Sequence, residues 1–258
     1  MTDLNSVLVS NQGAVRQLQL NNIARRNALS AAIYHRLSVE LKAAADDPAV
    51  RVLVISGSEG CFCSGNDLED FLGNPIRDAD HPIFNFMRAL NDFPKPVVAA
   101  VEGAAVGIGT TLLLHCDLVY SGRSALFKMP FVQLGICPEF ASSYLLPRLL
   151  GERRAAELLL LGKAVDGQRA EALGLINEVV GDGEALDRAL TVAQSLAAMP
   201  PKAMRDSKKL LRDSRQPGVE RALAAELEVL AGAVNYGELA EAIAALGEKR
   251  VPDFSRFE

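Results

Sequence analysis

Several residue types that mark particular functions are rare in this sequence of 258 residues. Tryptophan is absent, aromatic residues make up 5%, and the formal net charge is −5. This balance argues against a stacking platform or a basic surface for nucleic acid. Only three histidines and four cysteines occur, without a C-x-x-C pair, so no metal-binding pattern is present. We therefore expect neither a nucleic-acid partner nor a bound metal.

Long apolar runs and targeting signals are missing as well. No run reaches the roughly 18 residues that a membrane-spanning helix requires. Polar or charged positions recur throughout residues 1–20, which predicts no signal peptide. Cysteines without a disulfide-like spacing fit a reducing compartment. The sequence thus predicts a cytoplasmic protein without membrane insertion.

Strand and helix patterns alternate through the first part of the chain. A hairpin pattern with a glycine turn covers residues 7–20, and an amphipathic helix with an N-capping serine follows over 30–45. Strands followed by helices then recur over 50–71, 97–115 and 117–150, with a loop expected over 72–81. This recurrence predicts an α/β fold with crossover helices.

The rest of the chain carries only helical patterns. Pro200 and Pro201 separate a last segment of long amphipathic helices, so we expect a core over residues 1–199 and a helical region over 200–258. The apolar face of that region usually packs on the core or on another subunit. Lys208 and Lys209 are expected on its solvated face, with contact to a ligand of a neighbouring subunit as the alternative. The apolar face comprises Leu210, Leu211, Leu223, Leu227, Leu230, Ile243 and Leu246.

Two glycine-containing turns, over residues 61–68 and 103–109, follow predicted buried strands and open helices. Such turns leave backbone N–H groups unsatisfied. If the two strands are adjacent and parallel, the turns would aim two donors at one point, as in an oxyanion hole. Simpler interpretations stay open: Asp67 caps a helix in the first turn, and small residues allow close packing in the second.

A third candidate is Glu139, which lies in a largely apolar segment. Pro138 followed by this acid predicts the start of a helix. Apolar neighbours such as Ile136 and Phe140 would raise the pKa of the carboxyl and suit it to general acid–base catalysis. A surface glutamate favoured by the helix dipole is the alternative.

These segments together resemble the crotonase superfamily, also called the enoyl-CoA hydratase/isomerase family. Residues 27–29 (N-A-L), 63–68 (C-S-G-N-D-L) and 95–103 (K-P-V-V-A-A-V-E-G) resemble its N-A-L, A-G-x-D-L and K-P-V-I-A-A-V-x-G segments. Residues 248–254 resemble its C-terminal ending, so the match spans nearly the whole chain. The resemblance implies a crotonase-like spiral of ββα units with a helical C-terminal trimerisation region. It also implies a homotrimer or a dimer of trimers.

The resemblance further implies an acyl-CoA thioester substrate, with CoA as part of that substrate and no separate cofactor. Two backbone N–H groups stabilise the thioester enolate in such proteins, and at the matching positions here they belong to Ser64 and Ile108. Ile108 stands where glycine is usual, so its bulk is expected to alter what fits. Arg25 and Arg26 match a basic position that faces the CoA phosphates, with a solvated loop as the alternative. Further positions that match pocket-lining ones are Ala28, Ser64, Asn66, Asp67, Leu68 and Phe131.

Departures from the family pattern indicate which reaction to expect. Thr111 and Phe131 occupy the positions of the two catalytic glutamates of enoyl-CoA hydratases. Glu139 instead falls where peroxisomal-type Δ3,Δ2-enoyl-CoA isomerases place their single base, in a similar P-E-x-x-S-S-Y stretch. We therefore expect an enoyl-CoA isomerase that converts 3-enoyl to 2-enoyl thioesters with Glu139 as its acid and base. Hydration, thioester hydrolysis and a non-catalytic acyl-CoA-binding subunit are the alternatives.

Overall fold

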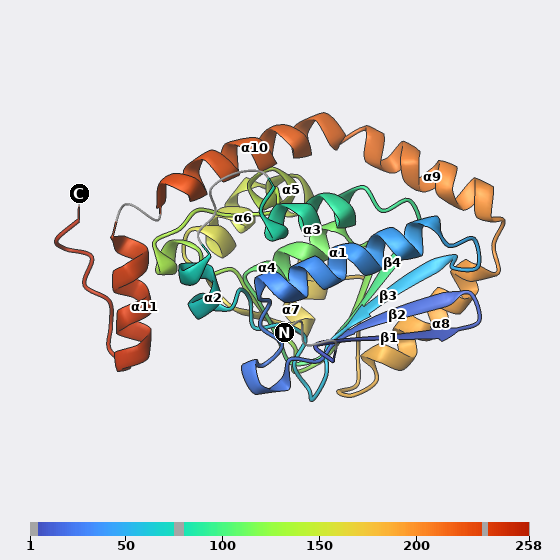
Figure 1. The fold of residues 1–258 in the computed structure, drawn as a ribbon, viewed down its shortest axis with the longest axis horizontal. Coiled ribbons are helices and arrows are strands. Elements are labelled where there is room, and N and C mark those ends of the chain that lie inside the picture. The colour runs from blue at the N-terminus through green and yellow to red at the C-terminus, as the bar shows by residue number, and fades with distance from the viewer. Residues whose placement is uncertain (1–4, 75–79, 234–236, 258) are drawn as a thin grey trace.

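The computed structural model describes residues 5–74, 80–233 and 237–257, which form a mixed α/β structure (Figure 1). The strands are β1 Val7–Gln12, β2 Val15–Leu20, β3 Val52–Ser56, β4 Val97–Val101, β5 Ala104–Val106, β6 Leu118–Gly122, β7 Leu126–Lys128, β8 Val165–Asp166 and β9 Glu178–Val180. The first helices are α1 Ala31–Asp46, α2 Leu68–Gly73, α3 Pro82–Asn91, α4 Ile108–Thr111, α5 Ser142–Leu150 and α6 Glu152–Leu159. They are followed by α7 Gly167–Leu173, α8 Ala185–Ala197, α9 Pro201–Asp213, α10 Gln216–Ala233 and α11 Glu238–Glu248. Short 3-10 turns are η1 Ile23–Arg25, η2 Leu112–His115 and η3 Val132–Leu134.

A six-stranded sheet in the order β1-β2-β3-β4-β6-β9 forms the body of the molecule. β1 and β2 are the predicted antiparallel hairpin, and every other neighbouring pair in this sheet is parallel. A smaller sheet has the order β5-β7-β8. Parallel neighbours require crossover connections, so the predicted α/β fold with crossover helices is confirmed.

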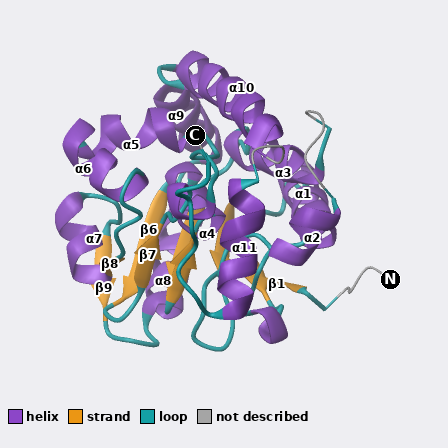
Figure 2. Ribbon diagram, turned by 90° about the vertical axis from the view of Figure 1, so that its left-hand side faces the viewer, coloured by secondary structure: helices purple, strands orange, loops and turns teal. Residues whose placement is uncertain are grey.

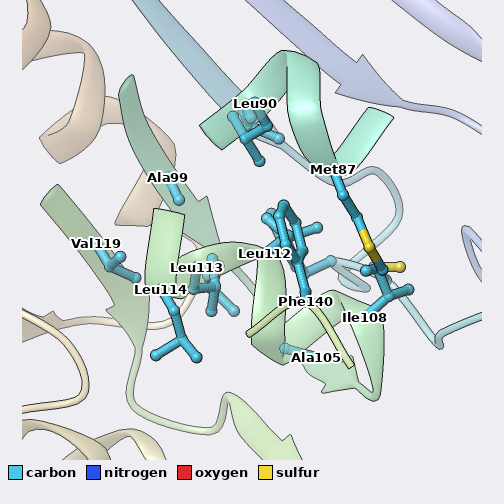
Figure 3. Packing of buried hydrophobic residues seen from close by; sticks show 14 of the residues in the cluster. Met87, Leu90, Ala99, Ala105, Ile108, Leu112, Leu113, Leu114, Val119 and Phe140 are labelled. Carbon is cyan, nitrogen blue, oxygen red and sulfur yellow. The ribbon is translucent and has the colours of Figure 1, made fainter. Parts of the chain in front are cut away.

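Helices cover both faces of the large sheet, and the alternation of side chains along β3 shows why. Val52 and Val54 pack with alanines of α8, whereas Leu53 and Ile55 belong to the main core with residues of α1 and α3. α8 lies against β3, β4 and β6. Figure 2 shows the strands between the helical layers, and Figure 3 shows the part of the core where Ile108 lies among apolar side chains.

Short elements account for most of the differences from the sequence-based prediction. β5, β7, β8 and β9 have two or three residues each, too few for an alternating pattern to stand out. The serine at position 30 caps α1 as expected, since its hydroxyl accepts from the Ile33 N–H at 3.4 Å. Residues 75–79 of the loop expected over 72–81 lie outside the described residues.

The C-terminal helices α9 and α10 form an arc along the outside of the molecule (Figure 1). Leu230 is buried, whereas Leu210 and Leu211 are 72% and 75% exposed. The prediction that Lys208 faces solvent is wrong: it is buried, and its Nζ donates to Asp117 Oδ2 at 2.6 Å and to the Lys95 carbonyl at 2.7 Å. Lys209 is exposed, as predicted.

In the described part of the chain, no helix has the length and apolar character of a membrane span.

Candidate active site

The two glycine-containing turns lie side by side, as an oxyanion hole requires. β3 and β4 are adjacent and parallel, and the turns that follow them are joined at Cys63 and Ala105 by a parallel bridge. The Cys63 N–H donates to the Ala104 carbonyl and the Val106 N–H donates to the Cys63 carbonyl, both at 2.9 Å. This pairing holds Ser64 and the start of α4 in fixed relative positions.

The two predicted N–H donors differ in their surroundings. Ile108 is the first residue of α4, so its N–H has no acceptor within the helix. The Ser64 N–H donates to the Arg26 carbonyl at 3.2 Å, and a thioester oxygen would have to share or displace that contact. The Ile108 side chain is fully buried in the main core (Figure 3). The Ile108 side chain is therefore not exposed to a ligand, and an effect of its bulk on what fits stays a prediction.

A largely apolar pocket of about 360 Å³ opens beside these turns. Ser64, Asn66, Leu68, Phe131 and Glu139 line it, as predicted from the sequence. Among the described residues that line the pocket, Glu139 supplies the acidic side chain. The remaining lining residues are Gly65, Val106, Gly107, Lys128, Pro130, Gln133, Leu134, Ala242, Leu246, Arg250 and Pro252.

Glu139 is 3% exposed and carries the electrostatic signature of a general base. Burial, and then the negative charge of Glu226, raise the pKa of the Glu139 carboxyl to about 8, although a hydrogen bond from Asn66 opposes them. Oε1 of Glu139 has no hydrogen-bond partner among the described residues. A buried carboxyl with an unpaired oxygen and a pKa near neutrality is suited to accept and return a proton.

Asn66 links Glu139 to a second buried side chain. The Tyr34 hydroxyl of α1 donates to Asn66 Oδ1, and the Asn66 side chain forms the hydrogen bond that favours the ionised form of Glu139. Tyr34 is 1% exposed. Burial, and then the charge of Glu139, raise the pKa of the Tyr34 hydroxyl well above its ordinary value. Tyr34 thus remains a neutral donor that orients the Asn66 amide.

The backbone that carries Glu139 has an unusual conformation. Phe140 and Ala141 have φ of 58° and 55°, in the left-handed region, which costs a residue with a Cβ about 1–2 kcal/mol. α5 begins only at Ser142. The prediction that Pro138 and Glu139 open a helix is therefore wrong, because the left-handed residues Phe140 and Ala141 form a turn before α5 begins. Strained backbone of this kind is concentrated at functional sites.

Comparison with known proteins gives the family. The sequence model described as enoyl-CoA hydratase/isomerase matches residues 10–256. The chain belongs to this family. Its fold is crotonase-like: the structure of Pseudomonas aeruginosa OdaA aligns with a TM-score of 0.91 and 44% identity, over 93% of this chain and 98% of that one.

Relatives in the enoyl-CoA hydratase/isomerase family include proteins named as hydratases and proteins named as isomerases. The 2,3-dehydroadipyl-CoA hydratase of Escherichia coli strain K12 is 34% identical over 97% of this chain and 99% of its own length. Human enoyl-CoA delta isomerase 2 is 33% identical over 90% of this chain and 60% of its own length. Overall identity therefore gives the family without choosing between the reactions.

Two positions that the resemblance matches to catalytic glutamates of hydratases hold other residues in this chain. These residues, Thr111 and Phe131, are buried. The Thr111 hydroxyl has no hydrogen-bond partner in the described structure, and Phe131 presents an aromatic ring to the pocket. Neither side chain can exchange a proton with bound water as a carboxyl does.

Other predicted site residues lie outside the pocket lining. Asp67 caps α2 by accepting from the Glu69 and Asp70 N–H groups, so the simpler interpretation holds for its side chain. Arg25 is exposed and pairs with Glu69 at 2.6 Å. Arg26 and Ala28 belong to the same loop and do not line the pocket. A role of these loop residues in CoA binding stays a prediction.

Sequence reasoning missed two residues near Glu139, namely Tyr34 and Glu226. Tyr34 lies on the buried face of α1, where a hydroxyl requires a partner. Glu226 shares a helical face with Leu223 and Leu230, so its spacing marks an acid on an apolar face. His115 is buried in the core and hydrogen-bonds to the turn after Glu139. Within the described ranges, no group of His, Cys, Asp or Glu is placed to hold a metal.

Proposed function

We propose that this member of the family is an enoyl-CoA isomerase that moves a double bond from the 3 to the 2 position of an acyl-CoA thioester. The observation that carries the proposal is which acidic side chains line the pocket. Glu139 contributes a carboxyl there, whereas Thr111 and Phe131, which the resemblance matches to the hydratase glutamates, carry no acidic group. One carboxyl suffices for a proton shift, but hydration requires both activation of water and protonation of the α-carbon.

In the proposed reaction the ionised Glu139 carboxylate takes a proton from C2 of the 3-enoyl thioester. The C2–H electron pair becomes the C1–C2 double bond of a dienolate that keeps its C3–C4 double bond, and the carbonyl π electrons move to the thioester oxygen as negative charge. Backbone N–H groups of Ser64 and Ile108 would stabilise that oxygen. The C2–C3 double bond of the product forms when C4 is protonated. Protonated Glu139 then returns the proton to C4, so that the product is the 2-enoyl thioester and Glu139 is ionised again.

The pocket walls support a proton shift over reactions with water. Leu68, Phe131 and Leu134 line the pocket with apolar surface. Excluding water protects a dienolate from side reactions and strengthens the hydrogen bonds that hold it. Low polarity also maintains the high pKa of Glu139, which brings its basicity closer to that required at C2.

Product analysis with paired substrates tests the proposal. Purified protein is incubated with a 3-enoyl-CoA and, separately, with the 2-enoyl-CoA of the same chain length, and products are separated by chromatography with mass detection. We expect 2-enoyl-CoA from the first substrate and, over the same time, little 3-hydroxyacyl-CoA from either. Rapid hydration of the 2-enoyl substrate without isomerisation of the 3-enoyl substrate would contradict the proposal. Release of free CoA would indicate hydrolysis, and binding without turnover would indicate a non-catalytic subunit.

A further inference from the structure

We propose that Glu226 is a positioning residue for Glu139, acting through the left-handed turn that joins Glu139 to α5. The inference rests on the proposed role of Glu139 as the proton carrier. Glu226 lies on α10 in the C-terminal helical region, far from residue 139 in the sequence. It is 6% exposed and does not line the pocket, so any influence on the reaction must pass through its neighbours.

The carboxylate of Glu226 binds the turn directly after Glu139. Oε2 accepts from the Ala141 N–H at 2.7 Å, and Oε1 accepts from the Ser143 N–H at 3.1 Å and the Ser143 hydroxyl at 2.5 Å. Ala141 is one of the two left-handed residues and directly precedes α5. Glu226 thus satisfies N–H groups that the start of α5 leaves without intrahelical partners.

His115 holds the same turn from the opposite direction. Its Nε2 lies 2.8 Å from the Phe140 carbonyl, and its ring stacks on the Phe140 ring with 3.8 Å between centroids. Burial lowers the pKa of His115 to about 3, so the ring is neutral and Nε2 carries the hydrogen that the carbonyl accepts. Because His115 fixes the carbonyl of Phe140 and Glu226 fixes the N–H of Ala141, the peptide between the two left-handed residues is bonded at both ends. This arrangement determines the direction in which the preceding residue, Glu139, enters the pocket.

Glu226 also contributes to the electrostatic environment of Glu139. Five polar or titratable groups of the described residues interact with Glu139. They are Asn66 from the loop before α2, Tyr34 of α1, Cys63 of the first glycine-containing turn, Cys137 of the loop that carries Glu139, and Glu226 of α10. Of these, Asn66 favours the ionised form of Glu139 and Glu226 disfavours it. Removal of the Glu226 charge therefore moves the titration of Glu139 to lower pH.

The experiment compares Glu226→Gln and Glu226→Ala with wild type in the isomerase assay. Gln keeps the shape and one carbonyl acceptor but loses the charge, whereas Ala removes every contact to the turn. For Glu226→Ala we expect kcat to fall about 10- to 100-fold with KM within threefold, as for a displaced catalytic group. For Glu226→Gln we expect a smaller loss and a kcat/KM profile whose acid limb lies at lower pH than in wild type.

Glu102→Ala is the matched control. The Glu102 carboxylate also accepts from backbone N–H groups, those of Gly183 and Ala185 at 3.0 Å, but at the start of α8 and away from the pocket. We expect this variant to lose thermal stability and keep its kcat and pH profile. A structural role of Glu226 would produce the same pattern as in Glu102→Ala. If Glu226→Ala does not fold, the pH profile of Glu226→Gln decides by itself.

Glu139→Gln separates failure of this inference from failure of the proposed function. If Glu139→Gln abolishes isomerisation while folded Glu226 variants keep wild-type kcat and pH profile, the inference is overturned and the proposed function stands. If Glu139→Gln retains activity, the proposed function itself fails. In the Glu139→Gln background, Glu226→Ala should cause no further loss; an undiminished loss there would show that Glu226 does not act through Glu139.

Discussion

The Tyr34 hydroxyl donates to Oδ1 of Asn66, which determines the orientation of an amide in the pocket wall. With Oδ1 engaged, the amide NH2 group is the part of Asn66 left to donate to Glu139. The bond between Asn66 and Glu139 favours the ionised carboxylate and lowers the pKa that burial raises. Tyr34 therefore supports the basic form of Glu139 without touching the substrate.

Tyr34→Phe is expected to weaken catalysis without disturbing the fold, because the phenyl ring fills the same buried space. Loss of the hydroxyl frees the amide to rotate, so the ionised form of Glu139 loses support and its pKa rises further. We expect kcat to fall about tenfold and the acid limb of kcat/KM to move to higher pH, opposite to the shift for Glu226→Gln. Tyr120→Phe, which removes a hydroxyl on the α8 face of the sheet, should change neither. An unshifted profile in Tyr34→Phe would contradict this role.

The pH dependence of wild type follows from the pKa of Glu139. The reaction starts from the ionised carboxylate, and burial raises the pKa of that group to about 8. Below that pH Glu139 is mostly protonated, so kcat/KM should rise with pH and reach half its maximum near pH 8. Steady-state rates across about pH 5.5–9.5, in buffers of constant ionic strength, cover about 2.5 units below and about 1.5 units above that midpoint. A profile already flat from pH 5.5 upward would mean that a group with a lower pKa is the base.

Ile108→Pro removes one N–H donor at the first position of α4, where proline is tolerated. If the Ile108 N–H stabilises the enolate oxygen, kcat should fall about 100- to 1,000-fold. Ile108→Ala is the control, since it also loses core packing but keeps the N–H. We expect it to be less stable and to retain most of its activity. Equal rates for the folded Pro and Ala variants would exclude this donor.

Lys208 and Lys209 are adjacent on α9 but should differ in their effect on stability. Lys208 is buried and bonds Asp117, whose carboxylate also accepts from the Val97 N–H at 2.7 Å. Lys208→Ala removes hydrogen bonds from a buried ammonium group to Asp117 and to the Lys95 carbonyl, and it should cost about 2 kcal/mol of unfolding free energy. Lys209 pairs with Asp213 on the surface, and Lys209→Ala should change stability by less than about 0.5 kcal/mol. Urea denaturation measures both, and equal effects would contradict the burial of Lys208.

The sequence predicts those helices and strands that are long enough for their apolar periodicity to be recognised. The hairpin β1–β2, the capped helix α1 and the buried strands β3 and β4 occur where the apolar pattern places them. The smaller sheet β5-β7-β8 escapes prediction, because its strands span two or three residues and obtain stability from pairing rather than from pattern. The burial of Lys208 escapes as well, because its partner Asp117 is distant in the sequence.

The site residues that can be predicted from the sequence are those whose neighbours in the sequence mark them as unusual. The two turns and Glu139 stand out because each joins special residues to a strand or an apolar segment, and the structure brings Ser64, Gly107 and Glu139 to one pocket. The groups that tune Glu139 come from α1 and α10, at sequence distances that no local pattern spans. Their only local signs are a hydroxyl on a buried helix face at Tyr34 and a carboxyl on an apolar face at Glu226.

The most direct measurement is the isomerisation rate of Glu139→Gln with a 3-enoyl-CoA substrate. Gln preserves the size of the side chain and its hydrogen-bonding shape but cannot accept and return the proton. Circular dichroism and the affinity for the thioester should stay close to wild type, while kcat falls at least about 1,000-fold, within the range for general acid–base catalysis. A folded Glu139→Gln protein that isomerises within about tenfold of the wild-type rate would show that the proton travels by another group.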